Sequence, residues 1–119
     1  MHPPISIALA QLNPHLGNVR ANLDRLADAR AKAAQNGAAI IVTPEMYLAG
    51  YPCDDLVLRS DFMDEVAAAI DELTALTKDG GPAIIVGAPY AEDGLIYNSV
   101  FVLDGGELIG RRDKVNLPN

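Results

Sequence analysis

The sequence predicts an α/β protein with a mixed sheet, because strand-like and helix-like segments alternate along the chain. Three apolar runs of strand length, at 5–12, 38–43 and 83–86, are separated by two stretches with apolar residues at helical spacing. A glycine-rich turn at 104–106 then joins two further strand-like segments. Parallel strands linked by helices are usually covered on both faces. We therefore expect a mostly parallel sheet with both faces covered, and antiparallel strands added by the final hairpin.

The residues at their ends indicate where the first strand and the first helix start and stop. The apolar run at 5–12 stops at Asn13-Pro14, since the residue before a proline disfavours the helical conformation. Asn18 is a good N-cap, and Asn36-Gly37 supplies a C-terminal stop. Between them, one helical face carries Val19, Leu23, Leu26, Ala27, Ala33 and Ala34.

The middle of the chain predicts a strand, a long loop and a second helix. AAIIVT at 38–43 is a buried strand that Pro44 ends. The irregular segment from Pro44 to about Leu58 is of the kind that often carries function. A helix then begins after a cap at Ser60 or Asp61 and ends at DGGP, 79–82. Its apolar face comprises Phe62, Val66, Ile70, Leu73 and Leu76.

The last part of the chain predicts three strands. AIIV at 83–86 is a buried strand, and the segments 95–103 and 107–112 form a hairpin around Asp104-Gly105-Gly106. The chain stops soon after this hairpin, with neither a closing helix nor a polar tail. We therefore expect residues 1–119 to form part of one domain that is incomplete.

Composition and charge exclude several classes of function. The 119 residues are 50% hydrophobic with a net charge of -7, which predicts a globular domain without a basic surface for nucleic acid or anionic lipid. No apolar run approaches the ~18 residues of a membrane-spanning helix, and no signal-peptide pattern is present. The single cysteine, Cys53, excludes an internal disulfide framework. We expect a cytoplasmic protein that binds neither nucleic acid nor membrane.

Familiar cofactor and metal motifs are absent from the sequence. PHLG at 14–17 follows the first strand, where a glycine-rich phosphate-binding loop would otherwise stand. Only His2 and His15 are available for a histidine-based triad or zinc site, and we expect both at the surface. Asp54 and Asp55 lack further metal ligands. We expect no cofactor site and no metal site in this chain.

Glu45 and Lys114 are the candidate catalytic residues. Each follows a predicted strand, and the carboxyl ends of strands are where open α/β sheets place their chemistry. Desolvation there would raise the pKa of Glu45 toward the range of a general base. An ammonium group beside it could stabilise negative charge that develops on a carbonyl substrate. The alternative is that both charges merely solvate the ends of strands.

Five segments resemble one enzyme family. TPEMYLAGYP at 43–52 resembles the glutamate motif of the nitrilase, or carbon-nitrogen hydrolase, superfamily. Its continuation CDDLVLR, 53–59, is similar to the amide-hydrolysing domain of glutamine-dependent NAD synthetases. The other segments agree in the right order: AQLNP at 10–14 with Gly17-Asn18, YNSV at 97–100, and KVNLPN at 114–119. The resemblance covers the whole chain.

The resemblance implies a Glu, Lys and Cys mechanism in which a thiol attacks the side-chain amide of glutamine, forms a thioester and releases ammonia. Glu45 matches the glutamate that activates the thiol and passes its proton to the leaving amine. Lys114 matches the lysine that steadies the tetrahedral intermediate. The family's nucleophile lies downstream of the lysine motif, so we expect it outside this chain and the 119 residues alone to be inactive. Cys53 occupies a variable position and is expected to be a loop residue without a catalytic role.

Other residues of these motifs have weaker assignments. By resemblance, Tyr51 would line the glutamine pocket; the alternative is that it packs the loop against the core. Asn98 matches a family asparagine near the site, although we expect it to satisfy local backbone groups. We expect Asp54, Asp55 and Arg59 to form ion pairs within the loop.

The resemblance also implies an architecture and partners. The complete domain would be a four-layer α-β-β-α sandwich of roughly twice this length, with residues 1–119 as its front half. It would supply ammonia to a separate synthetase domain that uses ATP and magnesium to amidate nicotinic acid adenine dinucleotide to NAD. We expect the full-length enzyme to be a homo-oligomer.

Two alternatives stay open. The first is another superfamily enzyme, such as a free-standing amidase or carbamoylase. The second is a non-catalytic α/β module for interaction or oligomerisation, which predicts that the head groups of Glu45 and Lys114 point apart.

Overall fold

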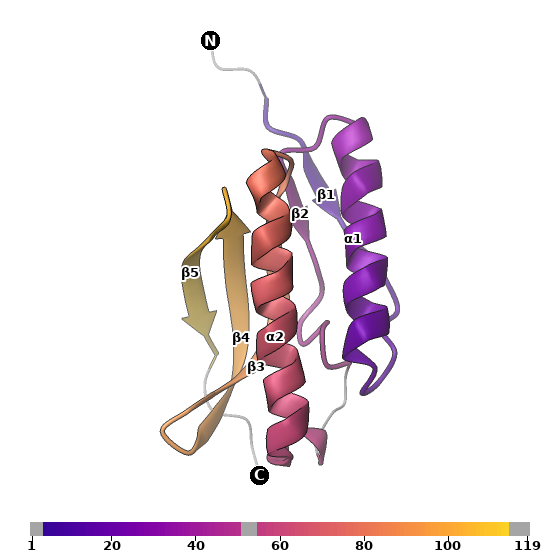
Figure 1. The fold of residues 1–119 in the computed structure, drawn as a ribbon. Coiled ribbons are helices and arrows are strands. Elements are labelled where there is room, and N and C mark those ends of the chain that lie inside the picture. Colours follow the sequence, from indigo (N-terminus) through magenta and orange to yellow (C-terminus); the bar gives the residue numbers. More distant parts are fainter. Residues whose placement is uncertain (1–3, 51–54, 115–119) are drawn as a thin grey trace.

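The computed structural model describes residues 4–50 and 55–114, which form one mixed sheet and two long helices (Figure 1). The strands lie side by side in chain order: β1 (Ile7–Leu9), β2 (Ile40–Val42), β3 (Ala83–Glu92), β4 (Leu95–Asp104) and β5 (Glu107–Asp113). The helices are α1 (Val19–Gln35) and α2 (Ser60–Leu76), with short 3-10 turns at Leu56–Leu58 and Thr77–Asp79. The predicted α/β class with a mixed sheet is confirmed.

Strand direction brings distant parts of the chain to one edge of the sheet. β1, β2 and β3 are parallel, β4 is antiparallel to β3, and β5 is antiparallel to β4. Two reversals restore the original direction, so β5 runs the same way as β2. The carboxyl ends of β2 and β5 therefore meet at the same edge as the amino end of β4.

Helix α1 forms as its sequence predicts. The Asn18 side chain accepts a hydrogen bond of 3.0 Å from the backbone N–H of Ala21, which satisfies one of the free donors of the first turn. The helix ends before Gly37, whose φ of 80° is readily adopted by glycine. Its buried side chains include Val19, Leu23, Leu26 and Ala33. Ala34, which the sequence places on the same apolar face, is exposed.

Helix α2 differs slightly from its prediction. The cap position is Arg59 rather than Ser60 or Asp61, and the Arg59 side chain makes no capping hydrogen bond. Phe62, Val66, Ile70 and Leu73 face the core as expected, whereas Leu76 is 37% exposed. Leu76 lies in the last turn of α2, from which the chain passes through the 3-10 turn and Gly80 to strand β3.

The structure contains a hairpin that the sequence analysis missed. β3 continues well beyond Val86 and pairs with β4 across a turn at Asp93-Gly94. Both turn residues have positive φ, 52° and 77°, which suits the right-handed twist of a two-residue hairpin. Gly87 and Pro89, residue types that are disfavoured inside strands, follow the predicted strand end at Val86. The expected hairpin between β4 and β5 is confirmed.

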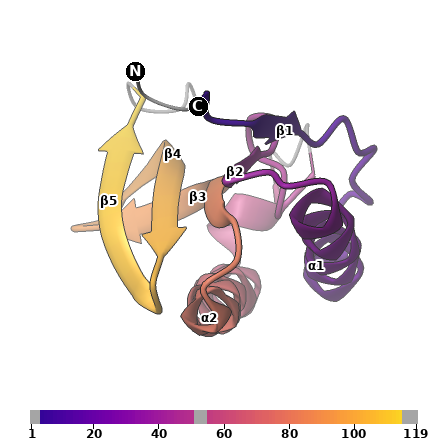
Figure 2. The ribbon, with the colours of Figure 1, turned by 90° about the horizontal axis from the view of Figure 1, so that it is seen from above.

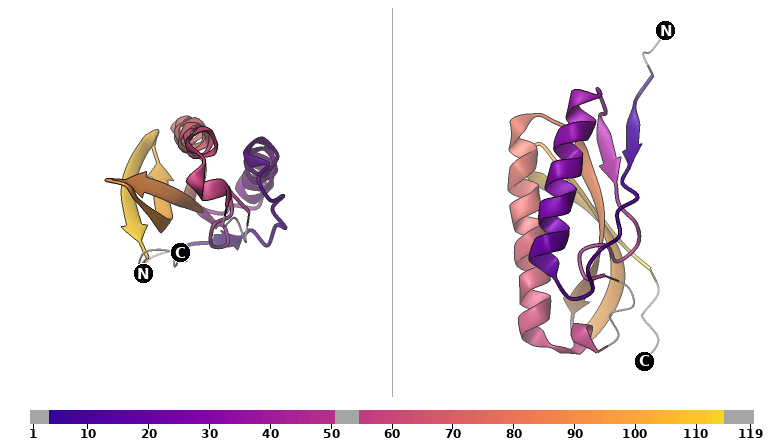
Figure 3. Two further views of the ribbon diagram at one scale, coloured as in Figure 1. Left: turned by 90° about the horizontal axis from the view of Figure 1, so that it is seen from below. Right: turned by 90° about the vertical axis from the view of Figure 1, so that its right-hand side faces the viewer.

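Both helices lie on the same face of the sheet (Figure 2), where they form a single layer (Figure 3). The row Ile41, Ile84 and Leu103 runs across three strands on this face and is buried. The neighbouring row, Leu9, Val42, Ile85 and Val102, points to the opposite face. Leu9 is 70% exposed there. Within the described residues, cover on both faces is therefore not found, because both crossovers pass over the same side.

Neither helix in residues 4–50 and 55–114 combines the length and the hydrophobicity that a bilayer-spanning segment requires.

Candidate active site

Glu45 lies in a turn that is pinned to strand β3. The chain leaves β2 at Val42, and the Thr43 hydroxyl then accepts a hydrogen bond of 3.0 Å from the backbone N–H of Gly87. The Gly87 carbonyl in turn accepts one of 3.1 Å from the N–H of Leu48. These two bonds bracket Glu45 and hold its backbone beside β3.

Gly87 allows this close approach because it has no side chain. A Cβ placed there would lie 2.6 Å from the carbonyl oxygen of Pro44 and 2.7 Å from the nitrogen of Met46. Both atoms belong to the backbone and cannot easily move aside. Met46 itself has a φ of 55°, which is uncommon for a residue other than glycine. The backbone on either side of Glu45 is therefore tightly constrained.

A buried polar cluster anchors the same turn from the side of α1. Met46, Tyr47, Leu48 and Ala49 are fully buried. The Tyr47 hydroxyl donates a 2.7 Å hydrogen bond to the carbonyl of Asn22, and the Asn22 amide donates to the carbonyl of Leu48 at 3.0 Å. Burial raises the pKa of Tyr47, so its hydroxyl stays protonated and can donate.

Three side chains converge at the edge formed by β2, β4 and β5. The Lys114 ammonium lies 3.1 Å from Oε1 of Glu45, and the two residues are 69 positions apart in the chain. The Asn98 amide donates a hydrogen bond of 2.5 Å to the same oxygen. The backbone N–H of Lys114 also donates to the Asn98 carbonyl, at 2.7 Å. The structure thus brings both predicted catalytic residues together.

The charge state of Glu45 differs from the expectation. Its pKa is lowered, first by the hydrogen bond from Lys114 and then by that from Asn98, and these effects outweigh desolvation. The expected rise of this pKa is therefore wrong for the described residues: the side chain is half exposed and faces two donors. At neutral pH the carboxylate is ionised, which is the form that accepts a proton.

A family model matches nearly the whole chain. Residues 6–119 match the family model for carbon-nitrogen hydrolases. The chain belongs to the carbon-nitrogen hydrolase family. The resemblance that the motif around Glu45 indicates is thereby confirmed.

This carbon-nitrogen hydrolase chain is 40% identical over 113 residues to the glutamine-dependent NAD(+) synthetase of Rhodobacter capsulatus, covering 95% of this chain and 20% of the relative. Its fold matches the glutamine-dependent NAD+ synthetase from Acinetobacter baumannii in complex with adenosine diphosphate, with a TM-score of 0.85 and 33% identity. This match covers 95% of this chain and 21% of the synthetase chain. The chain thus spans about a fifth of the length of these relatives.

A second kind of relative is an amidase. The carbon-nitrogen hydrolase chain matches the amidase from Nesterenkonia sp. AN1 with a TM-score of 0.85 and 27% identity, covering 98% of this chain and 46% of the amidase. In that structure acrylamide has undergone Michael addition at the amidase's active site cysteine.

The structure tests some of the other residues that the sequence singled out. Tyr51, Cys53 and Asp54 lie outside the described residues of the hydrolase chain. The Asn98 side chain contacts Glu45 rather than backbone groups, so that expectation was wrong. Among the described residues, Arg59 pairs with Asp61 of α2. In the described ranges, no three His, Cys, Asp or Glu side chains gather as metal ligands.

The sequence analysis missed the residues that hold the site in place. Gly87, Thr43 and Asn22 carry no chemistry of their own, so no motif rule singled them out. Gly87 interrupts an apolar run, which is a known signal for close backbone approach. Asn22 gives no such signal, because an asparagine within a helix is usually exposed.

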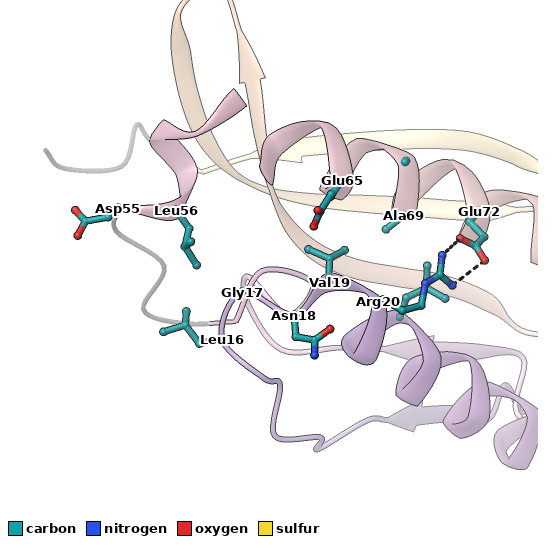
Figure 4. Close-up of a pocket in the computed structure, with 12 residues that line it drawn as sticks. Leu16, Gly17, Asn18, Val19, Arg20, Asp55, Leu56, Glu65, Ala69 and Glu72 are labelled. Atoms are coloured by element: carbon teal, nitrogen blue, oxygen red, sulfur yellow. Dashed lines mark hydrogen bonds and ion pairs between the residues drawn. The ribbon is translucent and has the colours of Figure 1, made fainter. Parts of the chain in front are cut away.

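A groove on the hydrolase chain lies apart from this site. About 1040 Å³ in volume, it runs between the start of α1 and the side of α2 that faces α1 (Figure 4). Arg20 points across it to Glu72, with a shortest distance of 2.6 Å between guanidinium and carboxylate. Neither Glu45 nor Lys114 lines it.

Proposed function

We propose that this chain forms the front part of a glutaminase domain, which releases ammonia from glutamine within a glutamine-dependent NAD synthetase. The observation that carries the proposal is the 3.1 Å contact between Glu45 and Lys114 at one edge of the sheet. The identity to NAD synthetases over nearly the whole chain supports this substrate. Because the chain spans about a fifth of those relatives, the activity belongs to a longer protein.

Glu45 and Lys114 have complementary roles in this proposal. The Glu45 carboxylate takes the proton from a cysteine thiol as sulfur bonds to the amide carbon of glutamine. Glu45 then gives that proton to the amine as the carbon–nitrogen bond breaks, releasing ammonia and leaving a thioester. Water hydrolyses the thioester to glutamate and regenerates the thiol. The Lys114 ammonium stabilises the negative charge of the tetrahedral intermediates.

The nucleophile comes from a segment beyond Lys114 in this proposal. Cys53, the one cysteine of the chain, stands at a variable position of its motif. Covering the half-exposed Glu45 with that segment would add desolvation, which raises the pKa of a carboxylate and strengthens it as a base. Tyr51, in the same sequence motif as Glu45, is proposed to contact glutamine.

The remaining partners belong to the full-length protein. ATP, magnesium and nicotinic acid adenine dinucleotide would act in a separate synthetase domain, to which the ammonia passes. A cytoplasmic homo-oligomer fits this role. No step assigned to residues of this chain uses a cofactor.

Another amidase of the same superfamily is the second candidate. The fold match to the Nesterenkonia amidase favours it, since that TM-score equals the one for the NAD synthetase. The higher identity to the synthetases favours glutamine. A non-catalytic module predicts that Glu45 and Lys114 point apart, which their contact contradicts.

The test is Glu45→Gln in the full-length protein, with glutamine-dependent and ammonia-dependent NAD synthesis measured side by side. Loss of the proton carrier should lower the glutamine-dependent rate by about 10²–10⁴-fold, whereas the ammonia-dependent rate survives. Glu107→Gln, an exposed glutamate at the start of β5, is the matched control and should change neither rate. Equal loss of both activities in Glu45→Gln would count against the proposal.

A further inference from the structure

Asn98 contacts both members of the candidate catalytic pair. Its side-chain amide donates to Oε1 of Glu45, and its main-chain carbonyl accepts from the N–H of Lys114. We propose that Asn98 is a positioning residue of the amidase site, which aims the Glu45 carboxylate and sets the place where Lys114 leaves the sheet. This inference rests on the proposed function and adds a third residue to it.

The register of β4 and β5 explains why Asn98 and Lys114 act on the same point. Ser99 pairs with Asp113, so the next pair along the ladder is Asn98 with Lys114. Directly opposed residues of antiparallel strands project to the same face, with Cβ atoms about 4.5–5.5 Å apart. Both side chains therefore reach the same side of the sheet, where the turn after β2 delivers Glu45.

The side-chain chemistry suits a positioning role. The terminal torsion of glutamate is broad, so a half-exposed carboxylate adopts many orientations unless it is held. Asn98 is only 5% exposed and lies within a strand, so it is a fixed donor. Among the described residues, both hydrogen bonds to the Glu45 side chain end on Oε1. Oε2 thus remains available to exchange a proton with thiol and leaving amine.

The neutral amide of Asn98 gives the Glu45 carboxylate a fixed direction, which the Lys114 side chain does not. The Lys114 side chain is 70% exposed and sits on a flexible stem, so it supplies charge without a fixed direction. In the described part of the chain, Lys114 is the charged group that shifts the pKa of Glu45. Of the neighbours on the strands, Gly87 of β3 has no side chain and Asn98 of β4 is neutral. Asn98 therefore adds orientation without an additional charge.

The experiment compares Asn98→Leu and Asn98→Asp with the full-length wild type, measuring glutamine hydrolysis across pH and ammonia-dependent synthesis in parallel. Misdirection of the carboxylate should lower kcat for glutamine about 10- to 100-fold with little change in KM. The acidic limb of kcat/KM should move to higher pH, because a donor that favours the ionised carboxylate is lost. Asn98→Asp should move it further, since a second carboxylate then faces Glu45.

Thr77→Val is the matched control for a purely structural effect. Thr77 is also fully buried, and its hydroxyl bonds to the backbone of Thr74 and Gly106, away from Glu45. This control should leave the acidic limb unchanged. An Asn98→Leu enzyme with the wild-type acidic limb, and no greater loss of kcat than Thr77→Val, would overturn the inference. Undiminished glutamine hydrolysis in Glu45→Gln would instead overturn the proposed function.

Discussion

Gly87 shows how a residue without functional groups shapes the site. The turn that carries Glu45 packs so closely on β3 that a Cβ at position 87 would collide with backbone atoms on both sides of the glutamate. Relief requires either the turn or the strand to shift. Glu45 would then lose its alignment with Asn98 and Lys114.

We therefore expect Gly87→Ala in the full-length protein to cost about 1–3 kcal/mol of local stability through overpacking. Hydrogen exchange followed by mass spectrometry should show faster exchange in peptides that cover residues 43–50. Glutamine-dependent synthesis should fall while ammonia-dependent synthesis is retained. Gly94→Ala is the control for backbone strain, because the φ of 77° at Gly94 is unusual for alanine while a Cβ there meets no atom within 4 Å. Similar exchange at 43–50 in both variants would contradict the close-approach argument.

For Cys53 we expect the opposite of what a lone thiol suggests. Cys53→Ser in the full-length protein should change glutamine hydrolysis less than about 3-fold, because the cysteine stands at a variable position of its motif and is assigned no bond-forming role. Steady-state kinetics with glutamine provides the measurement. A decrease of several orders of magnitude would identify Cys53 as the nucleophile.

An ion pair ties helix α1 to the connection between α2 and β3. Arg30 of α1 is buried, and its guanidinium donates to the Pro82 carbonyl and to both carboxylate oxygens of Asp79, at 2.8–3.0 Å. The Arg30 hydrogen bond, followed by that from the Gly81 N–H, lowers the pKa of Asp79 to about 2. This contact joins α1 to the turn that connects α2 with β3.

The ion pair predicts a pH dependence of stability. The folded-state pKa of Asp79 lies below the unfolded value of 3.8, so its contribution is present above pH 3.8 and disappears as the pH falls through about 2. In the 119-residue chain at low concentration and pH 7, Asp79→Asn should lower the urea concentration at the unfolding midpoint. Circular dichroism measures this midpoint. The difference in urea midpoint between the variant and the wild type should become smaller between pH 4 and pH 2. A gap that stays constant over this range would assign the effect to geometry rather than charge.

The face opposite the helices is apolar over several strands. Ile7 is 56% exposed and Leu9 is 70% exposed, and the row through Leu9 continues across Val42 and Ile85. Contiguous apolar surface of this kind marks an interface. In the proposed sandwich, the second sheet of the complete domain would cover it.

Leu9→Lys should therefore have opposite effects in two contexts. In the separate 119-residue chain it should reduce binding of a hydrophobic dye and self-association, since a charge interrupts the exposed apolar row. In the full-length protein it should cost about 3–5 kcal/mol of stability, because an unpaired charge is buried between sheets. Leu95→Lys, at the exposed tip of the β3–β4 hairpin, serves as the control and should change neither property. A full-length Leu9→Lys protein with wild-type thermal stability would contradict burial of this face.

Local patterns in the sequence were enough for the α/β class, both long helices, the hairpin at 104–106 and the family motif around Glu45. Capping residues, apolar spacing and turn glycines act over a few positions, so they can be read directly. The hairpin at Asp93-Gly94 was missed because local breakers at Gly87 and Pro89 concealed a strand that tertiary pairing continues.

The arrangement of the candidate site depends instead on contacts between segments that are far apart in the sequence. The meeting of Glu45 with Lys114 depends on two reversals of strand direction across 69 positions. The lowered pKa of Glu45 and its contact with Asn98 arise in the same packing, and the sequence-based expectation for each was wrong. Charge state depends on which groups lie within a few ångströms, and packing of the sheet determines those neighbours.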